Sequence, residues 1–168
     1  MIYGVLRLSE KNMRKNKKKE LMTAFREQVQ SLRNEEDMCR YAHHVDDLIA
    51  DFASITLRLK GKPKETAEDM MIAVCVRATQ RVRRADDEAD IEIGVIATEN
   101  IANTLYKNVE DKDKLKTLQQ LFLDEAMLQT EAYEHEPKKS KAKNYKHAAK
   151  RFANLYQKFH HKLVASRK

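Results

Sequence analysis

The chain has 168 residues, 35% of them charged, with only 3 glycines and 2 prolines. This composition predicts one mostly helical domain that is long enough to bury its own core. No apolar run approaches the ~20 residues of a membrane span, and residues 1–8 lack the small-residue exit of a secretory signal. We therefore expect a cytoplasmic protein whose two cysteines, Cys39 and Cys75, are reduced and packed.

Positive charge is concentrated at the two ends of the chain. Residues 1–19 carry 7 Lys/Arg and 1 acid, whereas residues 137–168 carry 11 Lys/Arg and no acid. Residues 20–136 hold 15 basic and 25 acidic residues, within a formal net charge of +7 for the whole chain. An acidic body with two basic ends favours an anionic partner.

The N-terminal third predicts two helices. Residues 2–8 are apolar and partly β-branched, which is typical of a short strand or an extended arm. Ser9 is a candidate N-cap for a helix that runs to about Arg33. Asn34 is a candidate cap for a second helix, whose apolar residues recur with helical period as far as a stop at Gly61.

The stretch 66–106 predicts a central antiparallel helix pair. A capping box at Thr66 would begin its first helix, and a charged turn at 85–88 would separate the two. Apolar residues lie on most sides of both helices, which is typical of helices buried among others. We expect this pair to form the centre of the domain.

Two further helices are expected after residue 108. The inner face of the first contains Leu115, Leu118, Phe122, Ala126 and Tyr133, while Leu123 and Met127 lie on another side and indicate a partner surface or a second packing contact. A polar, basic linker at 138–143 precedes an amphipathic helix over about 144–164.

The predicted fold class is therefore all-α: a bundle of about six helices around a central antiparallel pair (66–106), with a basic C-terminal helix. Residues 1–136 would form the helical bundle with its basic N-terminal segment, and residues 137–168 the basic linker and C-terminal helix, packed on the same domain. No repeat of 20–50 residues is evident, so we do not predict a solenoid.

The last helix presents an aromatic face and a basic face. A row of Lys and Arg side chains binds a phosphate backbone favourably, because binding releases the counterions condensed on the nucleic acid. The nucleic-acid-binding candidates from both basic ends are Lys15, Lys17, Lys18, Lys19, Lys138, Lys139, Lys141, Lys143, Lys146, Lys150, Arg151, Lys158 and Lys162. The competing interpretation is that the acidic body of the same chain holds the basic tail.

Acidic side chains recur on the helix expected after the charged turn. Glu88, Glu92 and Glu99 project toward one side of its helical period. Such a stripe indicates either a divalent-metal site or a network of ion pairs, for which Arg77 and Arg81 are the candidate partners.

A second acidic pattern, Glu65-x-x-Glu68 followed by Asp87-x-x-Asp90, resembles the signature of MazG-like nucleoside-triphosphate pyrophosphatases. The resemblance covers about 40 residues, and Asp87 stands where that family usually has Glu. It implies an all-α enzyme in which these acids hold magnesium against a triphosphate. A continuous helix over 66–84 would instead hold Glu68 and Asp87 roughly 27 Å apart.

These patterns favour a non-catalytic protein that binds RNA or DNA through phosphate contacts from its two basic ends, with no cofactor and little sequence preference. The alternative is an adaptor or inhibitor that grips a protein with the acidic body or the tail helix, and the pyrophosphatase ranks third. A homo-oligomer remains open.

Overall fold

In the computed structural model, the backbone is described for residues 2–166 and the side chains for residues 14–166. Within this part of the chain every element is a helix, so the predicted all-α bundle of about six helices is confirmed. The helices are α1 (Ile2–Asn34), α2 (Met38–Arg58), α3 (Lys62–Arg84), α4 (Glu88–Asn108), α5 (Lys112–His135) and α6 (Lys139–Ala165). None of the described helices has the length and hydropathy that crossing a membrane requires.

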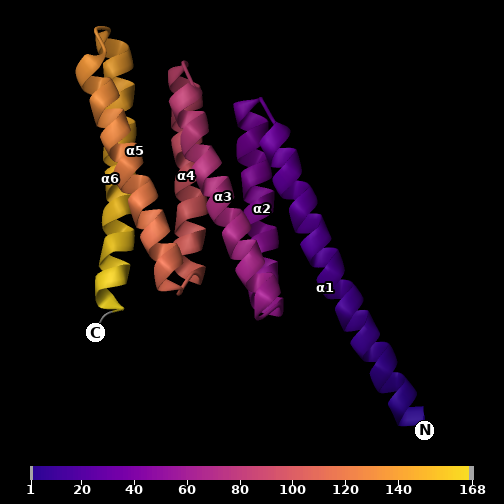
Figure 1. Cartoon of the computed structure of the whole chain (residues 1–168). Helices are drawn as coiled ribbons and strands as arrows, with labels where there is room; N and C mark the ends of the chain where they lie inside the picture. The colour runs from indigo at the N-terminus through magenta and orange to yellow at the C-terminus, as the bar shows by residue number, and fades with distance from the viewer. Residues whose placement is uncertain (1, 167–168) are drawn as a thin grey trace.

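Consecutive helices pair into three antiparallel hairpins, α1–α2, α3–α4 and α5–α6, which lie side by side in one row (Figure 1). Helices α2, α4 and α6 form one layer of the row, and α1, α3 and α5 form the other. Contacts between neighbouring hairpins are more extensive in the α2–α4–α6 layer. The hairpin α3–α4 is therefore the middle one, with a neighbour on each side.

Aspartates begin three of the helices. Asp37, Asp87 and Asp111 are the N-caps of α2, α4 and α5, and each side chain accepts a backbone N–H of the first turn. An aspartate in this position satisfies a donor that has no partner within the helix. Gly61, with a φ of 73°, makes the turn between α2 and α3, in the left-handed region that glycine adopts without strain.

Three predictions near the N-terminus are wrong. Residues 2–8 are not a strand, because α1 is helical from Ile2, and Ser9 is consequently inside the helix rather than at its cap. The lysine-rich stretch that follows has good helix propensity, so the helix extends through both segments. The cap of α2 is Asp37 instead of Asn34, which is the last residue of α1.

Two later boundaries also differ from the prediction. Helix α3 begins at Lys62, before the expected cap Thr66, with Pro63 in its first turn where the missing N–H costs nothing. The expected linker 138–143 is helical from Lys139. Lysine and alanine favour a helix, and the neighbouring α5 gives the apolar side of α6 a surface to pack on.

The core contains large side chains from every hairpin, all almost completely buried: Phe25, Tyr41 and Phe52 from α1–α2, Met71 and Ile101 from α3–α4, and Phe122, Phe152 and Phe159 from α5–α6. The rings of Phe122 on α5 and Phe159 on α6 stack with centroids 5.8 Å apart. Tyr133 is partly exposed, contrary to its predicted inner position.

The two cysteines are free and differ in environment. Cys75 is buried, which raises the pKa of its thiol, whereas Cys39 is exposed. The prediction that both thiols are packed is therefore wrong for Cys39. Its place beside the apolar face of α2 does not bring it under a neighbouring helix.

Val74→Asp is expected to unfold the protein. Val74 is buried in the middle hairpin with 2% of its surface exposed, and an unpaired carboxylate there would cost several kcal/mol. The matched control is Leu57→Asp on α2, where the side chain is 85% exposed, with an expected change within about 0.5 kcal/mol. Urea unfolding followed by circular dichroism gives both free energies, and equal values would place Val74 outside the core.

Candidate nucleic-acid interface

The basic face of α6 and the acidic stripe of α4, which the sequence presents as separate features, lie against each other. Arg151 Nε donates to Glu99 Oε2 at 2.8 Å, and a second N–H of the same guanidinium donates to the other carboxylate oxygen. Glu92 Oε1 lies 3.5 Å from Arg151 Nη1. The hydrogen bond to Glu99 raises the pKa of Arg151. The guanidinium is therefore held in an ion pair with α4 and is less available to an external anion.

Two lysines of α6 extend this line of polar contacts, which we call the α4–α6 seam, toward the end of α4. Lys158 Nζ donates to Asn103 Oδ1 at 2.8 Å and lies 4.6 Å from the centre of the Tyr106 ring. Lys162 Nζ donates to the carbonyl of Val109 at 2.7 Å and to that of Tyr106. The last carbonyls of a helix lack intrahelical donors and carry partial negative charge, so a lysine there stabilises the helix end.

Two of the three acids of the α4 stripe, Glu92 and Glu99, therefore have a structural role. Glu92 also lies 2.8 Å from His147 Nε2, and Glu88 is exposed in the first turn of α4. Among the described side chains, no three of His, Cys, Asp and Glu come together in a way that could hold a metal ion. Arg77 and Arg81, the pairing partners expected from the sequence, are not bonded to this stripe; α6 supplies the partners instead.

The acids that resemble the pyrophosphatase signature are separated. Glu68 is buried near the start of α3 and pairs with Lys114 at 3.4 Å, whereas Asp87 caps α4 beyond the other end of α3. Since α3 is continuous between them, they do not meet at one magnesium ion.

The remaining cations of the predicted tail are more available. Five of them are exposed around the α5–α6 turn and along α6: Lys138, Lys139, Lys143, Lys146 and Lys150. Lys141 lies 3.9 Å from Asp86, an exposed carboxylate on the neighbouring turn, and such surface pairs contribute little.

The predicted N-terminal candidates Lys15, Lys17, Lys18 and Lys19 are all exposed on α1. They lie in the first twenty residues of α1, a helix at the edge of the row (Figure 1). None of them forms an ion pair with another described side chain.

Helical spacing aligns some of these cations with residues farther along α1. Steps of four, seven and seven residues place Lys15, Lys19, Arg26 and Arg33 on one side of the helix, and all four are exposed. We call these four residues the α1 basic stripe. The acids Glu20 and Glu27 are rotated by about 80° or more from every residue of the stripe, so they do not interrupt its positive charge.

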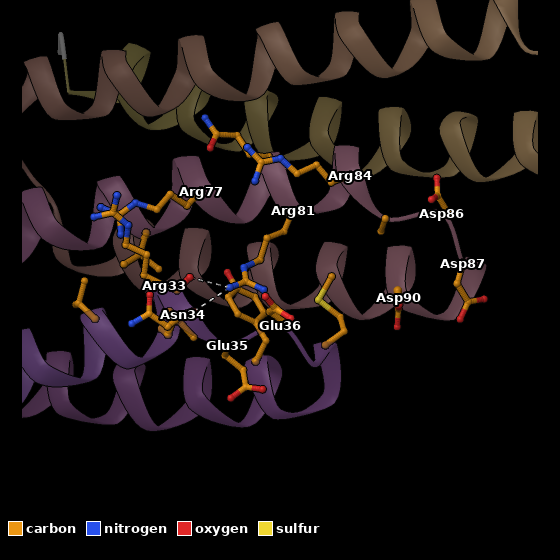
Figure 2. Close-up of a pocket in the computed structure, with 17 residues that line it drawn as sticks. Arg33, Asn34, Glu35, Glu36, Arg77, Arg81, Arg84, Asp86, Asp87 and Asp90 are labelled. Carbon is orange, nitrogen blue, oxygen red and sulfur yellow. Dashed lines mark hydrogen bonds between the residues drawn. The ribbon is translucent and has the colours of Figure 1, made fainter.

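The stripe ends at a cleft of about 900 Å³ between α1 and α3. Arg33 from α1 and Arg77 and Arg84 from α3 line this cleft. Its acids are Glu35 and Glu36, directly after α1, and Asp86, Asp87 and Asp90 at the opposite side of the view in Figure 2. The three arginines make no ion pair with a described side chain. They are therefore free to bind an anion.

The fourth arginine of the cleft has a structural role. Arg81 Nη2 donates to the carbonyl of Leu32 at 2.9 Å, at the end of α1, and its guanidinium lies 4.1 Å from the centre of the Tyr41 ring. Burial raises the pKa of Tyr41 to about 12, although the charge of Arg81 opposes this shift. Arg81 thus fixes the end of α1 against α3 and shapes the floor of the cleft.

The candidate list from the sequence omitted Arg26, Arg33, Arg77 and Arg84. They lie outside the charge-dense ends, in the segment whose net charge is negative. The available signal was the seven-residue step within each pair, which repeats a side of the helix. Their assembly into one cleft required the packing of α1 on α3.

Comparisons with protein-family models, with curated proteins and with solved structures return no match for this chain.

Arg151→Gln is expected to lower the free energy of unfolding by about 1–2 kcal/mol, because it leaves the partly buried Glu99 without its bidentate partner. The matched control is Lys143→Gln, which removes an exposed charge from the same helix, with an expected change within about 0.5 kcal/mol. Urea unfolding measures both. Equal effects would mean that the α4–α6 seam does not hold α6 in place.

Proposed function

We propose that the protein binds the sugar–phosphate backbone of RNA or DNA along the α1 basic stripe and into the α1–α3 cleft, and that it has no catalytic activity of its own. The observation that carries this proposal is the alignment of four exposed cations, without described ion-pair partners, that lead into an arginine-lined cleft. A cytoplasmic location, as expected from the sequence, would suit this role.

The dimensions and chemistry of this surface support the proposal. Lys15 and Arg33 are about 27 Å apart along the axis of α1, which matches roughly eight steps of ~3.4 Å along one strand of a duplex. Arg33, Arg77 and Arg84 offer planar guanidinium groups, which bind phosphate oxygens in a bidentate manner. Phosphate contacts position a nucleic acid but carry no base information, so little sequence preference is expected.

The exposed tail lysines are proposed as a second, weaker contact. They lie at the opposite edge of the row from α1 (Figure 1), and Arg151, Lys158 and Lys162 are already bonded to α4. The sequence favoured the tail as the main contact because it counts more charges there. Because three of the tail cations are bonded to α4, we propose that α1 makes the larger contribution to nucleic-acid binding.

Changing Lys15, Lys19, Arg26 and Arg33 together to Gln is expected to weaken binding to RNA and DNA at low salt. Each lost phosphate contact lowers the slope of log K against log salt by about 0.7–0.9, so the slope should fall by roughly 3. Mobility-shift titrations across a salt series measure both quantities. The four residues are exposed, so the variant should remain folded.

The matched control changes Lys60, Lys107, Lys112 and Lys116 to Gln, which removes the same charge from exposed positions away from the cleft. If net charge alone governs binding, the two variants lose the same slope. A wild type that shifts neither RNA nor DNA at low salt would reject the proposal.

The alternative of a protein-binding adaptor gains support from a different part of the molecule, an apolar groove on α5 and α6.

A further inference from the structure

The α5–α6 hairpin has one side that no described helix covers. In the row, α3–α4 covers α1–α2, and α5–α6 covers α3–α4, but α5–α6 itself is at the end (Figure 1). Three of the large apolar side chains that the described structure exposes belong to α5: Met127, Leu128 and Tyr133, with 63%, 42% and 38% of their surface accessible. A further hairpin in the row would bury this face, but here the apolar side chains are exposed to solvent.

These side chains line a groove of about 990 Å³ between α5 and α6. Its α6 wall includes Ala149 and Ala153, whose small side chains leave room for a side chain from outside. Met127, the most exposed of the apolar lining residues, is flexible enough to fill an irregular space. The groove therefore offers both a projecting apolar group and a depression of matching character.

The two edges of the groove carry opposite charges. Asp124, Glu131 and Glu134 lie on the α5 side, and Lys146 and Lys150 lie on the α6 side. No ion pair joins the two edges among the described side chains. The edges are therefore free to pair with a surface of the reverse pattern.

We infer that this groove is a homodimer interface, occupied by the same groove of a second copy of the chain. A two-fold axis that runs parallel to the helices along the groove places α5 of each copy over α6 of the other. The acids then face the lysines twice over, once on each side of the axis, and each Met127 faces the alanines of the other copy. Such an isologous arrangement closes at two subunits.

The charge pattern selects this arrangement over the other two-fold alternative. An axis perpendicular to the helices would place α5 over α5 and α6 over α6, with acid against acid and lysine against lysine. Like-charge contacts disfavour that pairing. An apolar centre bordered by complementary charges is also the usual anatomy of a protein interface.

The test is the mass of the intact chain in solution, measured by sedimentation equilibrium up to about 100 µM, where a micromolar dimer is populated. The wild type should be a dimer, and Met127→Lys should raise the dissociation constant at least about tenfold by placing a charge in the apolar centre. The control, Leu57→Lys, changes an apolar side chain of α2 that is 85% exposed and should leave the dimer intact.

A charge exchange tests the geometry. Glu131→Lys with Glu134→Lys should weaken the dimer, and adding Lys146→Glu with Lys150→Glu to the same chain should restore it, because both edges are then reversed. Failure of this rescue would overturn the proposed axis. A wild type that is monomeric at every concentration would overturn the homodimer and leave a different protein as the occupant.

The outcome is separable from the nucleic-acid proposal, since Met127 lies in the α5–α6 groove, remote from the α1–α3 cleft. Met127→Lys should bind nucleic acid with a nearly unchanged affinity per chain, and the stripe variant should still form the dimer. Circular dichroism confirms that each variant retains its helices.

Discussion

The position of the last hairpin depends on the ion pair between Arg151 and Glu99. This pair, with Lys158 on Asn103 and Lys162 on the last carbonyls of α4, ties α6 to the middle hairpin along a line of polar contacts. Apolar contacts support it, such as the edge-to-face approach of Tyr106 and Phe159 at 5.8 Å. Polar bonds with defined partners fix how α6 sits along α4, which apolar packing alone specifies less strictly.

The same contacts determine which of the chain's cations are available to bind an external anion. Of the two basic ends, the C-terminal segment has the larger number of cations, yet three of its candidates for phosphate binding are bonded to the protein itself. On α1 all the cations whose side chains are described are exposed, and four of them are aligned. The number of charges in a segment therefore matters less than the number without a partner, because only the latter gain a partner when an anion binds.

The two edges of the row have different characters. The α1 edge is basic, while the α5–α6 edge has an apolar groove with acids on one side and lysines on the other. In the proposed dimer the α5–α6 edges meet at the centre, and the two α1 basic stripes lie at the outer ends. The main nucleic-acid contact on α1 and the self-association surface would then be separate, whereas Lys146 and Lys150 of the tail would be engaged in the dimer. Two stripes on one dimer would bind a polyanion more tightly than one.

The sequence by itself determined the helical class, the number of helices and most of the core, because apolar side chains at helical spacing, such as Val45, Leu48, Phe52 and Ile55, must be buried together. It could not place the helix ends exactly, since Asn34 and Asp37 are both good caps and only packing chooses between them. Nor could it pair Arg151 with Glu99, which are 52 residues apart, or bring Arg33 beside Arg77. Only the tertiary structure decides these contacts, because they depend on how the hairpins stack. The spacing of residues within one helix carries no information about which helix packs beside it.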